Sequence, residues 1–180
     1  MLAIKEKIEK QRDPNKQPTV LQDILYLFIK IIAIIGIFIL LFTLIFGIHR
    51  NANADMDPAI KDGDLILYYR FDKNYTAKDL VMYEYDDTTY VSRVVAVAGD
   101  QVDINEEGLI INGSLQQEYD IYTDTLRYAT DVEFPLEVKT GEIFVLGDNR
   151  EQASDSRIFG SIKIKNTFGK VFMIIRRRNL

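Results

Sequence analysis

The chain has 180 residues, with 22 basic and 27 acidic side chains and a net charge of -5, which is about one domain's worth of sequence. Residues 1–50 carry seven basic and four acidic side chains, whereas residues 51–175 carry twelve and 23, so the main body has a net charge of -11. An acidic body argues against nucleic acid as a partner. The lack of cysteine excludes disulfides and thiol chemistry, and the single histidine, His49, argues against a Ser-His-Asp triad and multi-histidine metal sites, so we expect no cofactor.

One apolar segment dominates the sequence. From Ile24 to Ile48 the only charge is Lys30, and a helix of this length measures about 37 Å, against about 30 Å for a bilayer core. The pattern predicts a transmembrane helix over residues 24–48. A cleaved signal peptide is the rival interpretation, because residues 52–54 read Ala-Asn-Ala, but the apolar region is too long and starts too late for that. A buried core helix is disfavoured because residues 31–48 form a run of 18 uncharged apolar residues with no polar face.

Basic residues set the expected orientation. Five of them precede the apolar segment, and only Arg50 and Lys61 lie in the 20 residues after it. The positive-inside rule then predicts a cytoplasmic tail over residues 1–23 and an extracellular domain over residues 49–180. We therefore expect a single-pass protein of the cell membrane.

The domain after His49 is predicted to be built from strands. Alternating apolar residues and turn residues replace helical periodicity, and Asn112-Gly113 is a strong hairpin signal. The sequence therefore favours a mainly β, antiparallel fold. The expected strands are 65–70, 80–85, 88–98, 101–104, 109–111, 142–146 and 167–175.

Three segments of this domain resemble the type I signal peptidases. They occur in the family's order and read DMDPAI at 55–60 with Gly-Asp at 63–64, SRVVAVAGD at 92–100, and GDNREQASDSRIFG at 147–160. The last is long and specific, and it is similar to the family's G-D-N-R-x-x-S-x-D-S-R-x-[FW]-G segment. The resemblance implies a signal-peptidase-like antiparallel β domain on one N-terminal transmembrane helix, as in Gram-positive members of the family.

The chain departs from the family at the positions that carry its chemistry. Those peptidases cleave with a serine nucleophile and a lysine general base, and the matching positions here are Asp55 and Ser92. The serine that orients the lysine matches Ala153, and the small residue that supports the oxyanion hole matches Asn53. Catalysis by such a pair needs both the serine hydroxyl that attacks and the lysine amine that accepts its proton, and this chain has neither group at the matching positions.

The residues that resemble the family's structural motif are retained. The resemblance therefore implies a pseudoenzyme that keeps the scaffold without the dyad, and Asp155 is expected to pair with Arg157 rather than bind substrate. The retained residues are Met56, Pro58, Gly147, Asp148, Asp155, Arg157 and Gly160.

The function that this resemblance implies is non-catalytic assistance in building surface pili. Signal-peptidase-like proteins of this kind assist sortase-dependent pilin polymerisation, so the expected partners are the membrane and a secreted protein such as a pilin or a sortase. An active signal peptidase with non-standard residues is the alternative, with Asp55 as an acid or Ser92 as a displaced nucleophile. A purely structural membrane-anchored domain is the third hypothesis.

Overall fold

A computed structural model describes residues 20–176 and divides the chain into two units after Thr43. The described part of the first unit is residues 20–43, which lie in helix α2, Val20–Ile45. The last two residues of α2 belong to the second unit. This helix is long and apolar enough to cross a membrane, and none of its side chains is buried. An exposed apolar surface on every side of a helix is what a bilayer accommodates.

The helix differs from its predicted bounds. It begins four residues before Ile24 and ends three before Ile48, because residues 46–48 belong to strand β1, Phe46–Arg50. There Gly47 lies opposite Tyr68, and a Cβ at Gly47 would come within 2.0 Å of the Tyr68 ring. Apolar composition alone does not separate a helix from a strand that follows it without a break. The predicted tail over residues 1–23 lies, up to residue 19, outside the described residues.

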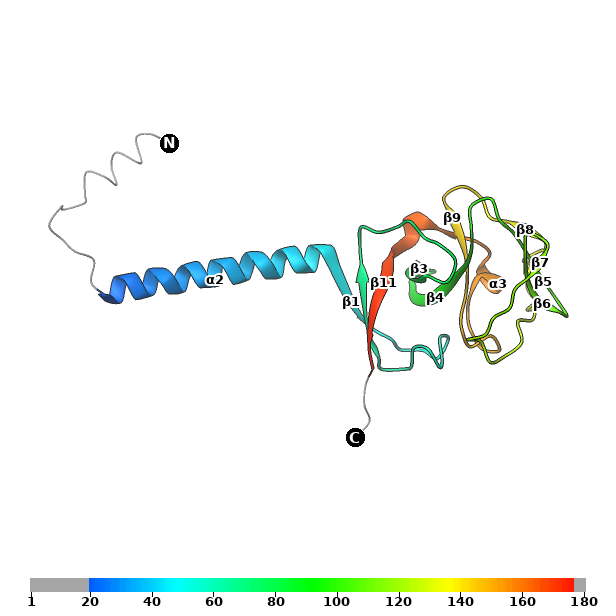
Figure 1. Ribbon diagram of the computed structural model, residues 1–180, viewed down its shortest axis with the longest axis horizontal. Coiled ribbons are helices and arrows are strands. Elements are labelled where there is room, and N and C mark those ends of the chain that lie inside the picture. The colour runs from blue at the N-terminus through cyan, green and yellow to red at the C-terminus, as the bar shows by residue number, and fades with distance from the viewer. Residues whose placement is uncertain (1–19, 177–180) are drawn as a thin grey trace. The chain divides into compact units, whose positions relative to one another are not determined.

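The second unit is built from two antiparallel sheets (Figure 1). The seven-stranded sheet has the order β1-β2-β11-β3-β4-β9-β10, and the four-stranded sheet has the order β7-β6-β5-β8. The remaining elements are β2 (Leu65–Tyr69), β3 (Leu80–Tyr85), β4 (Thr88–Val97), β5 (Gln101–Asn105), β6 (Gly108–Ile111), β7 (Ser114–Leu115), β8 (Leu136–Glu137), β9 (Glu142–Leu146), α3 (Ser156–Phe159), β10 (Ile162–Lys163), a 3-10 turn (Ile164–Asn166) and β11 (Thr167–Ile175).

The mainly β, antiparallel fold class is confirmed, and all seven predicted strands are present within one residue at each end. The elements that the sequence did not reveal are β1, three strands of two residues, the single turn of helix α3 and the 3-10 turn Ile164–Asn166. The short strands are too brief to show alternation, so only their partners identify them.

Side chains of the central strands are buried on both faces of the large sheet. In β9, Ile143 and Val145 join one apolar cluster, whereas Phe144 and Leu146 join another that also contains Val102 of the small sheet. Because successive side chains of a strand point to opposite faces, one strand connects both clusters. The four-stranded sheet is therefore packed on the large sheet through β9.

Gly169 lies where β11 passes closest to β2. Its φ is +149°, and a Cβ built there would lie 2.0 Å from the carbonyl oxygen of Tyr69. Gly141 also has a positive φ, of +81°, but no atom lies within 4 Å of the Cβ position. The two glycines therefore share a backbone requirement, and only Gly169 adds a steric one.

We predict that Gly169→Ala lowers the free energy of unfolding by about 1–3 kcal/mol more than Gly141→Ala does, because only the first substitution forces two strands apart. Chemical denaturation of the full chain in detergent micelles measures both. Equal losses in the two variants would contradict the close approach of β11 to β2.

Candidate functional site

Asp55 lies in the irregular link between β1 and β2, against the segment 147–157. The backbone oxygen of Asp55 accepts a hydrogen bond from the Asn149 amide at 3.0 Å, and the Asn149 side-chain amide donates to the oxygen of Ala54 at 3.1 Å. Two bonds from one residue thus fix the link where the resemblance places the nucleophile position.

Gly147 makes this close approach sterically possible. A Cβ at Gly147 would lie 2.5 Å from the backbone oxygen of Asp55 and 2.3 Å from the Cβ of Ala153. Ala153 is buried at 1% exposure, so the small side chain fills the space beside the glycine. The structure therefore brings together two of the positions that the sequence singled out, Asp55 and Ala153, on either side of Gly147.

Ser92 lies on β4 and is fully buried. Its hydroxyl lies 3.2 Å from the hydroxyl of Tyr83 on β3, and no hydrogen bond joins it to Asp55. The next residue, Arg93, points to the other face of the sheet, as strand alternation predicts, and binds Asp148 with two bonds of 2.8 and 2.6 Å. The sequence did not identify Tyr83, because nothing in its neighbourhood marks it before the strands pair.

Asp155 and Arg157 form a fully buried ion pair, as predicted, with a closest distance of 2.8 Å. Asp155 also accepts the amide of Gly147 at 3.0 Å and caps α3 by accepting the amide of Arg157. A buried carboxylate with this many donors is a structural anchor. Gly160, retained in the same segment, is the C-cap of α3.

Arg150 is a further buried charge that the sequence analysis did not select. It donates to both carboxylate oxygens of Glu118, at 2.7 and 2.6 Å, and to the hydroxyl of Thr125. Glu118 precedes Arg150 by 32 residues in a segment without periodicity, so no sequence signal joins the two. Through this pair the loop after β7 is tied to the segment that holds Asp55 in place.

The carboxyl group of Asp55 has a raised pKa. Burial is the main cause, the amide of Ser154 opposes it by donating a hydrogen bond, and the negative charge of Asp155 raises the pKa further. Burial likewise raises the pKa of Tyr83, with smaller contributions from Asp155 and Asp55. Asp55, Tyr83 and Ser92 are thus close enough to influence one another electrostatically.

Asn53, the residue at the position that resembles the oxyanion support, lies in the same link. Its side-chain oxygen is buried without a hydrogen-bond partner, and its backbone oxygen accepts from Asn51 at 2.7 Å. Met56 and Pro58 follow directly; Met56 is fully buried, and its sulfur accepts the amide of Asp148 at 3.4 Å. The catalytic or vestigial roles of these positions stay predictions from the resemblance.

The sequence profile of a known family, described as signal peptidase, peptidase S26, matches residues 24–176. The chain belongs to this family. Signal peptidase IB of Staphylococcus aureus (strain N315) is 31% identical over 162 residues, covering 78% of this chain and 85% of that protein. Signal peptidase I of Bacillus licheniformis is 28% identical over 138 residues, covering 71% and 74%. A signal peptidase I crystal structure from Enterococcus faecalis is 26% identical, with a TM-score of 0.47, and covers 56% of this chain and 99% of that chain.

Membership in the peptidase S26 family corrects one expectation. From the sequence we expected that the chain is not an enzyme, because Asp55 and Ser92 replace the serine and the lysine. The relatives are named signal peptidases, which are enzymes, and nothing in these similarities marks a loss of activity. The replacements at Asp55 and Ser92 therefore do not by themselves justify the conclusion that the chain is a pseudoenzyme.

We predict that Asp155→Asn lowers the free energy of unfolding by about 3–5 kcal/mol, because it leaves the guanidinium of Arg157 buried without its charge partner. Asp103→Asn is the control, since the ion pair of Asp103 with Arg127 is partly exposed and contributes about 1 kcal/mol or less. Urea denaturation of the micelle-bound chain compares the two. Similar losses would contradict the anchoring role of Asp155.

We also predict that Asp55→Asn stabilises the protein at neutral pH. An acid with a raised pKa binds its proton more tightly in the folded state, so the folded state is disfavoured as pH rises from the ordinary pKa through the raised one. Asparagine removes this penalty and keeps an oxygen for the Ser154 amide. The difference in melting temperature should be positive at pH 7 and should vanish below about pH 4. A constant difference across this range would contradict the raised pKa.

Proposed function

We propose that this member of the signal peptidase family binds an extended segment of an exported protein along an open edge of β4, and that this binding assists the assembly of surface pili in a Gram-positive cell. The observation that carries the proposal is the half-paired strand β4 beside Asp55. The proposed partner is a pilin or a sortase, and the peptide-binding step is what the geometry supports.

Strand β4 has a partner on both sides only along its second half. It pairs with β3 from Thr88 to Arg93, whereas its pairing with β9 begins at Arg93 and runs to Val97. Within residues 20–176 no strand pairs with the other edge of β4 between Thr88 and Ser92. An open edge of about five residues is a template on which an extended peptide can add as a strand.

The residues at the Thr88–Tyr90 end of that edge are exposed or half-buried, whereas Val91 is 2% exposed and Ser92 is fully buried. Val94 exchanges both of its backbone hydrogen bonds with Lys78 and Asp79 on the β3 side. Because backbone groups alternate in direction along an antiparallel strand, the N–H and C=O groups of Val91 and Thr89 point to the opposite edge. A peptide added at Thr89 would extend toward the half-buried carboxyl of Asp55 and the buried Ser92.

Aromatic side chains lie beside the same half of β4. Phe159 of α3 stacks on Tyr85 with ring centroids 4.1 Å apart and packs on Tyr90 at 5.3 Å. Tyr85 remains 38% exposed. Such rings offer apolar contact to the side chains of an added strand, and they supply affinity beyond the backbone bonds.

The proposed orientation follows from the distribution of basic residues. The N-terminal tail is cytoplasmic and the β domain lies outside, with α2 as the single transmembrane segment. An exported protein that emerges from the membrane then meets the β domain directly. The organisation into tail, helix and outer domain is part of the same proposal.

A second candidate function is cleavage of leader peptides, favoured by the family and by the raised pKa of Asp55. A carboxylate whose pKa lies closer to neutral is a better general base at pH 7. It would take a proton from a water molecule while that water attacks the scissile carbonyl, and it would return the proton to the leaving amine. Ser92 is fully buried and bonded to Tyr83, so its hydroxyl does not serve as the nucleophile in this scheme.

Binding to the open edge of β4 is tested with peptides copied from the leader region of an exported preprotein. We predict that N-methylation of the alternate amides that face β4 weakens binding to the full chain at least about tenfold, because it removes the strand-pairing donors. Methylation of the intervening amides is the matched control and should leave affinity unchanged. Fluorescence anisotropy in micelles measures both, and equal effects would refute edge pairing.

Two further experiments separate the candidate functions. Deletion of the gene should abolish the high-molecular-weight pilin ladder on immunoblots if the protein assists pilus assembly, and normal ladders would refute that role.

Incubation of the full chain with a leader-bearing preprotein tests cleavage: turnover lost in Asp55→Ala supports a peptidase, whereas no turnover by the folded wild-type chain excludes it.

A further inference from the structure

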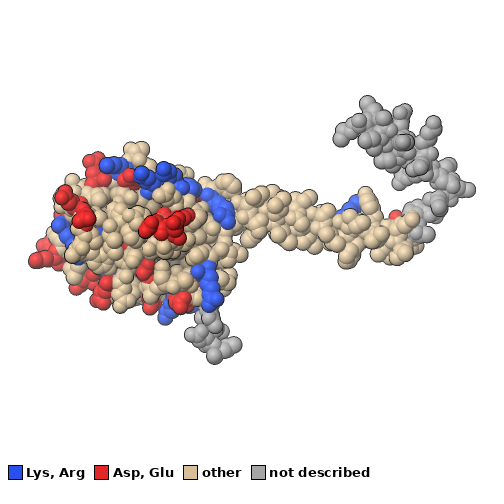
Figure 2. Space-filling view, turned by 180° about the vertical axis from the view of Figure 1, so that it is seen from behind, with Lys and Arg blue, Asp and Glu red and all other residues tan. Residues whose placement is uncertain are grey.

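The part of the β domain that contains the small sheet is strongly acidic. Residues 101–137 hold nine Asp or Glu and one basic residue, Arg127, a net charge of -8 in a chain whose total is -5. Arg127 is already paired with Asp103. In the space-filling view, acidic side chains predominate at the end of the domain formed by β5–β8 (Figure 2). This concentration of negative charge belongs to no part of the candidate site at Asp55.

The loop after β7 also exposes large apolar side chains. Tyr119 is 83% exposed and Tyr122 is 80% exposed, and Leu126 is exposed as well. Two residues separate the two tyrosines, so their Cα atoms lie within about 11 Å of each other. Exposed tyrosines are enriched where proteins bind other proteins.

Two buried arginines hold this loop in place. Arg150 binds Glu118 and Thr125, and Arg157 donates to the backbone oxygen of Leu126 at 3.1 Å. Tyr128 closes the same stretch by donating to the backbone oxygen of Arg150 at 2.9 Å. The exposed tyrosines therefore stand on a loop that is fixed at several points. A fixed loop loses little entropy when a partner binds.

A cleft of about 180 Å³ lies between this loop and the turn that joins β5 to β6. Carboxylates line it, and no basic side chain does; its apolar walls come from the loop and from β6. Such a cleft can hold a lysine or arginine side chain. Its methylene groups would contact the apolar walls, and its charged end would lie among the carboxylates. The charged lining is Glu106, Glu107, Asp124 and Glu118, of which Glu118 is already bound by Arg150, and the apolar lining is Leu109, Ile121 and Leu126.

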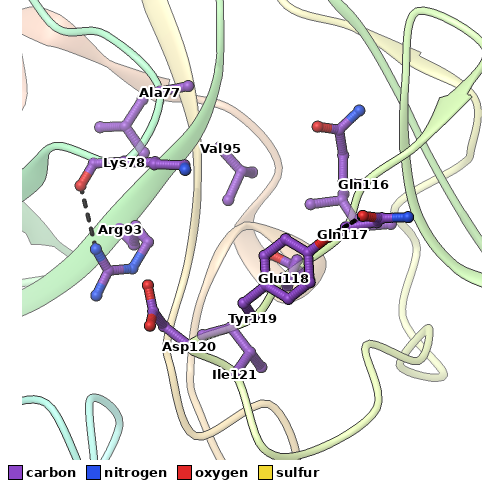
Figure 3. Close-up of a pocket in the computed structure, with 12 residues that line it drawn as sticks. Ala77, Lys78, Arg93, Val95, Gln116, Gln117, Glu118, Tyr119, Asp120 and Ile121 are labelled. Carbon is purple, nitrogen blue, oxygen red and sulfur yellow. Dashed lines mark hydrogen bonds between the residues drawn. The ribbon is translucent and has the colours of Figure 1, made fainter.

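A second cleft, of about 130 Å³, lies on the side of the loop that faces β4. Figure 3 shows Tyr119 and Asp120 on one side of it and Lys78 and Arg93 on the other. Arg93 is neutralised by Asp148, but the Lys78 ammonium makes this cleft mixed in charge. A cationic side chain is therefore better accommodated by the first cleft, and Leu109, Gln116, Glu118 and Ile121 line both clefts.

We propose that the loop after β7 and the β5–β6 turn form a docking surface for a lysine- or arginine-bearing segment of a partner protein. Charge selects the partner, since residues 101–137 hold nine acidic side chains and one arginine, and the buried Arg150 from outside this segment neutralises only Glu118 among them. The tyrosines supply the contact area, and the acidic cleft takes one basic side chain. This surface is separate from the open edge of β4, so each is tested without the other. A second copy of this chain is disfavoured because like charges would meet.

The probe is a fluorescent synthetic peptide in which lysine alternates with leucine or serine, with a matched peptide that carries glutamate at every lysine position. Anisotropy with the full chain in zwitterionic micelles measures affinity, and empty micelles give the baseline. The lysine peptide should bind, and the glutamate peptide should not. No binding of the lysine peptide up to about 1 mM, or equal binding of both, overturns the proposal.

Two variants locate the site, and a third controls for charge. Glu106→Gln combined with Glu107→Gln should weaken binding about tenfold, and Tyr119→Ala combined with Tyr122→Ala should do the same. Asp86→Asn combined with Asp87→Asn, at the β3–β4 turn, changes the total charge as much as the glutamine variant does and should alter affinity less than about twofold. Circular dichroism confirms that each variant is folded. Equal weakening in all three, or none in the first two, refutes a defined docking surface.

Discussion

The rest of the domain depends on the interactions of one buried carboxylate, that of Asp155. It accepts hydrogen bonds from the amides of Gly147 and Arg157, binds the guanidinium of Arg157, and caps α3. A charge this deeply buried is tolerated only when donors surround it. The segment 147–157 must therefore fold in one way, and Asn149 then fixes the position of Asp55.

Two buried arginines extend this constraint outward. Arg157 reaches the backbone of Leu126 and lies 4.1 Å from the ring centre of Tyr128, and Arg150 reaches Glu118. The irregular loop after β7 is thus ordered by side chains of the family's longest motif rather than by its own secondary structure. One buried network therefore orders both the link that carries Asp55 and the acidic loop after β7.

Much of the fold was predictable because it depends on short-range patterns. Alternation located β4 and β11, and short apolar runs bounded by turn residues located β3 and β9, whose side chains are buried on both faces of the sheet. The end of α2 was not predictable, because the apolar run continues into β1 and only pairing with β2 reveals the strand. The candidate site was located by resemblance, but the bond between Ser92 and Tyr83 joins adjacent strands and has no local signal.

The sequence by itself determined the apolar helix, the antiparallel strands, the family and the identities of Asp55 and Ser92. Those features depend on residue types and on short spacings along the chain, so they can be inferred without knowing which distant segments pack together. Only the tertiary structure decided that Ser92 is sealed inside the sheet, that β4 keeps one open edge, and that Glu118 meets Arg150 across 32 residues. Burial, edges and distant ion pairs arise when segments far apart in the chain are packed together, and no local pattern encodes them.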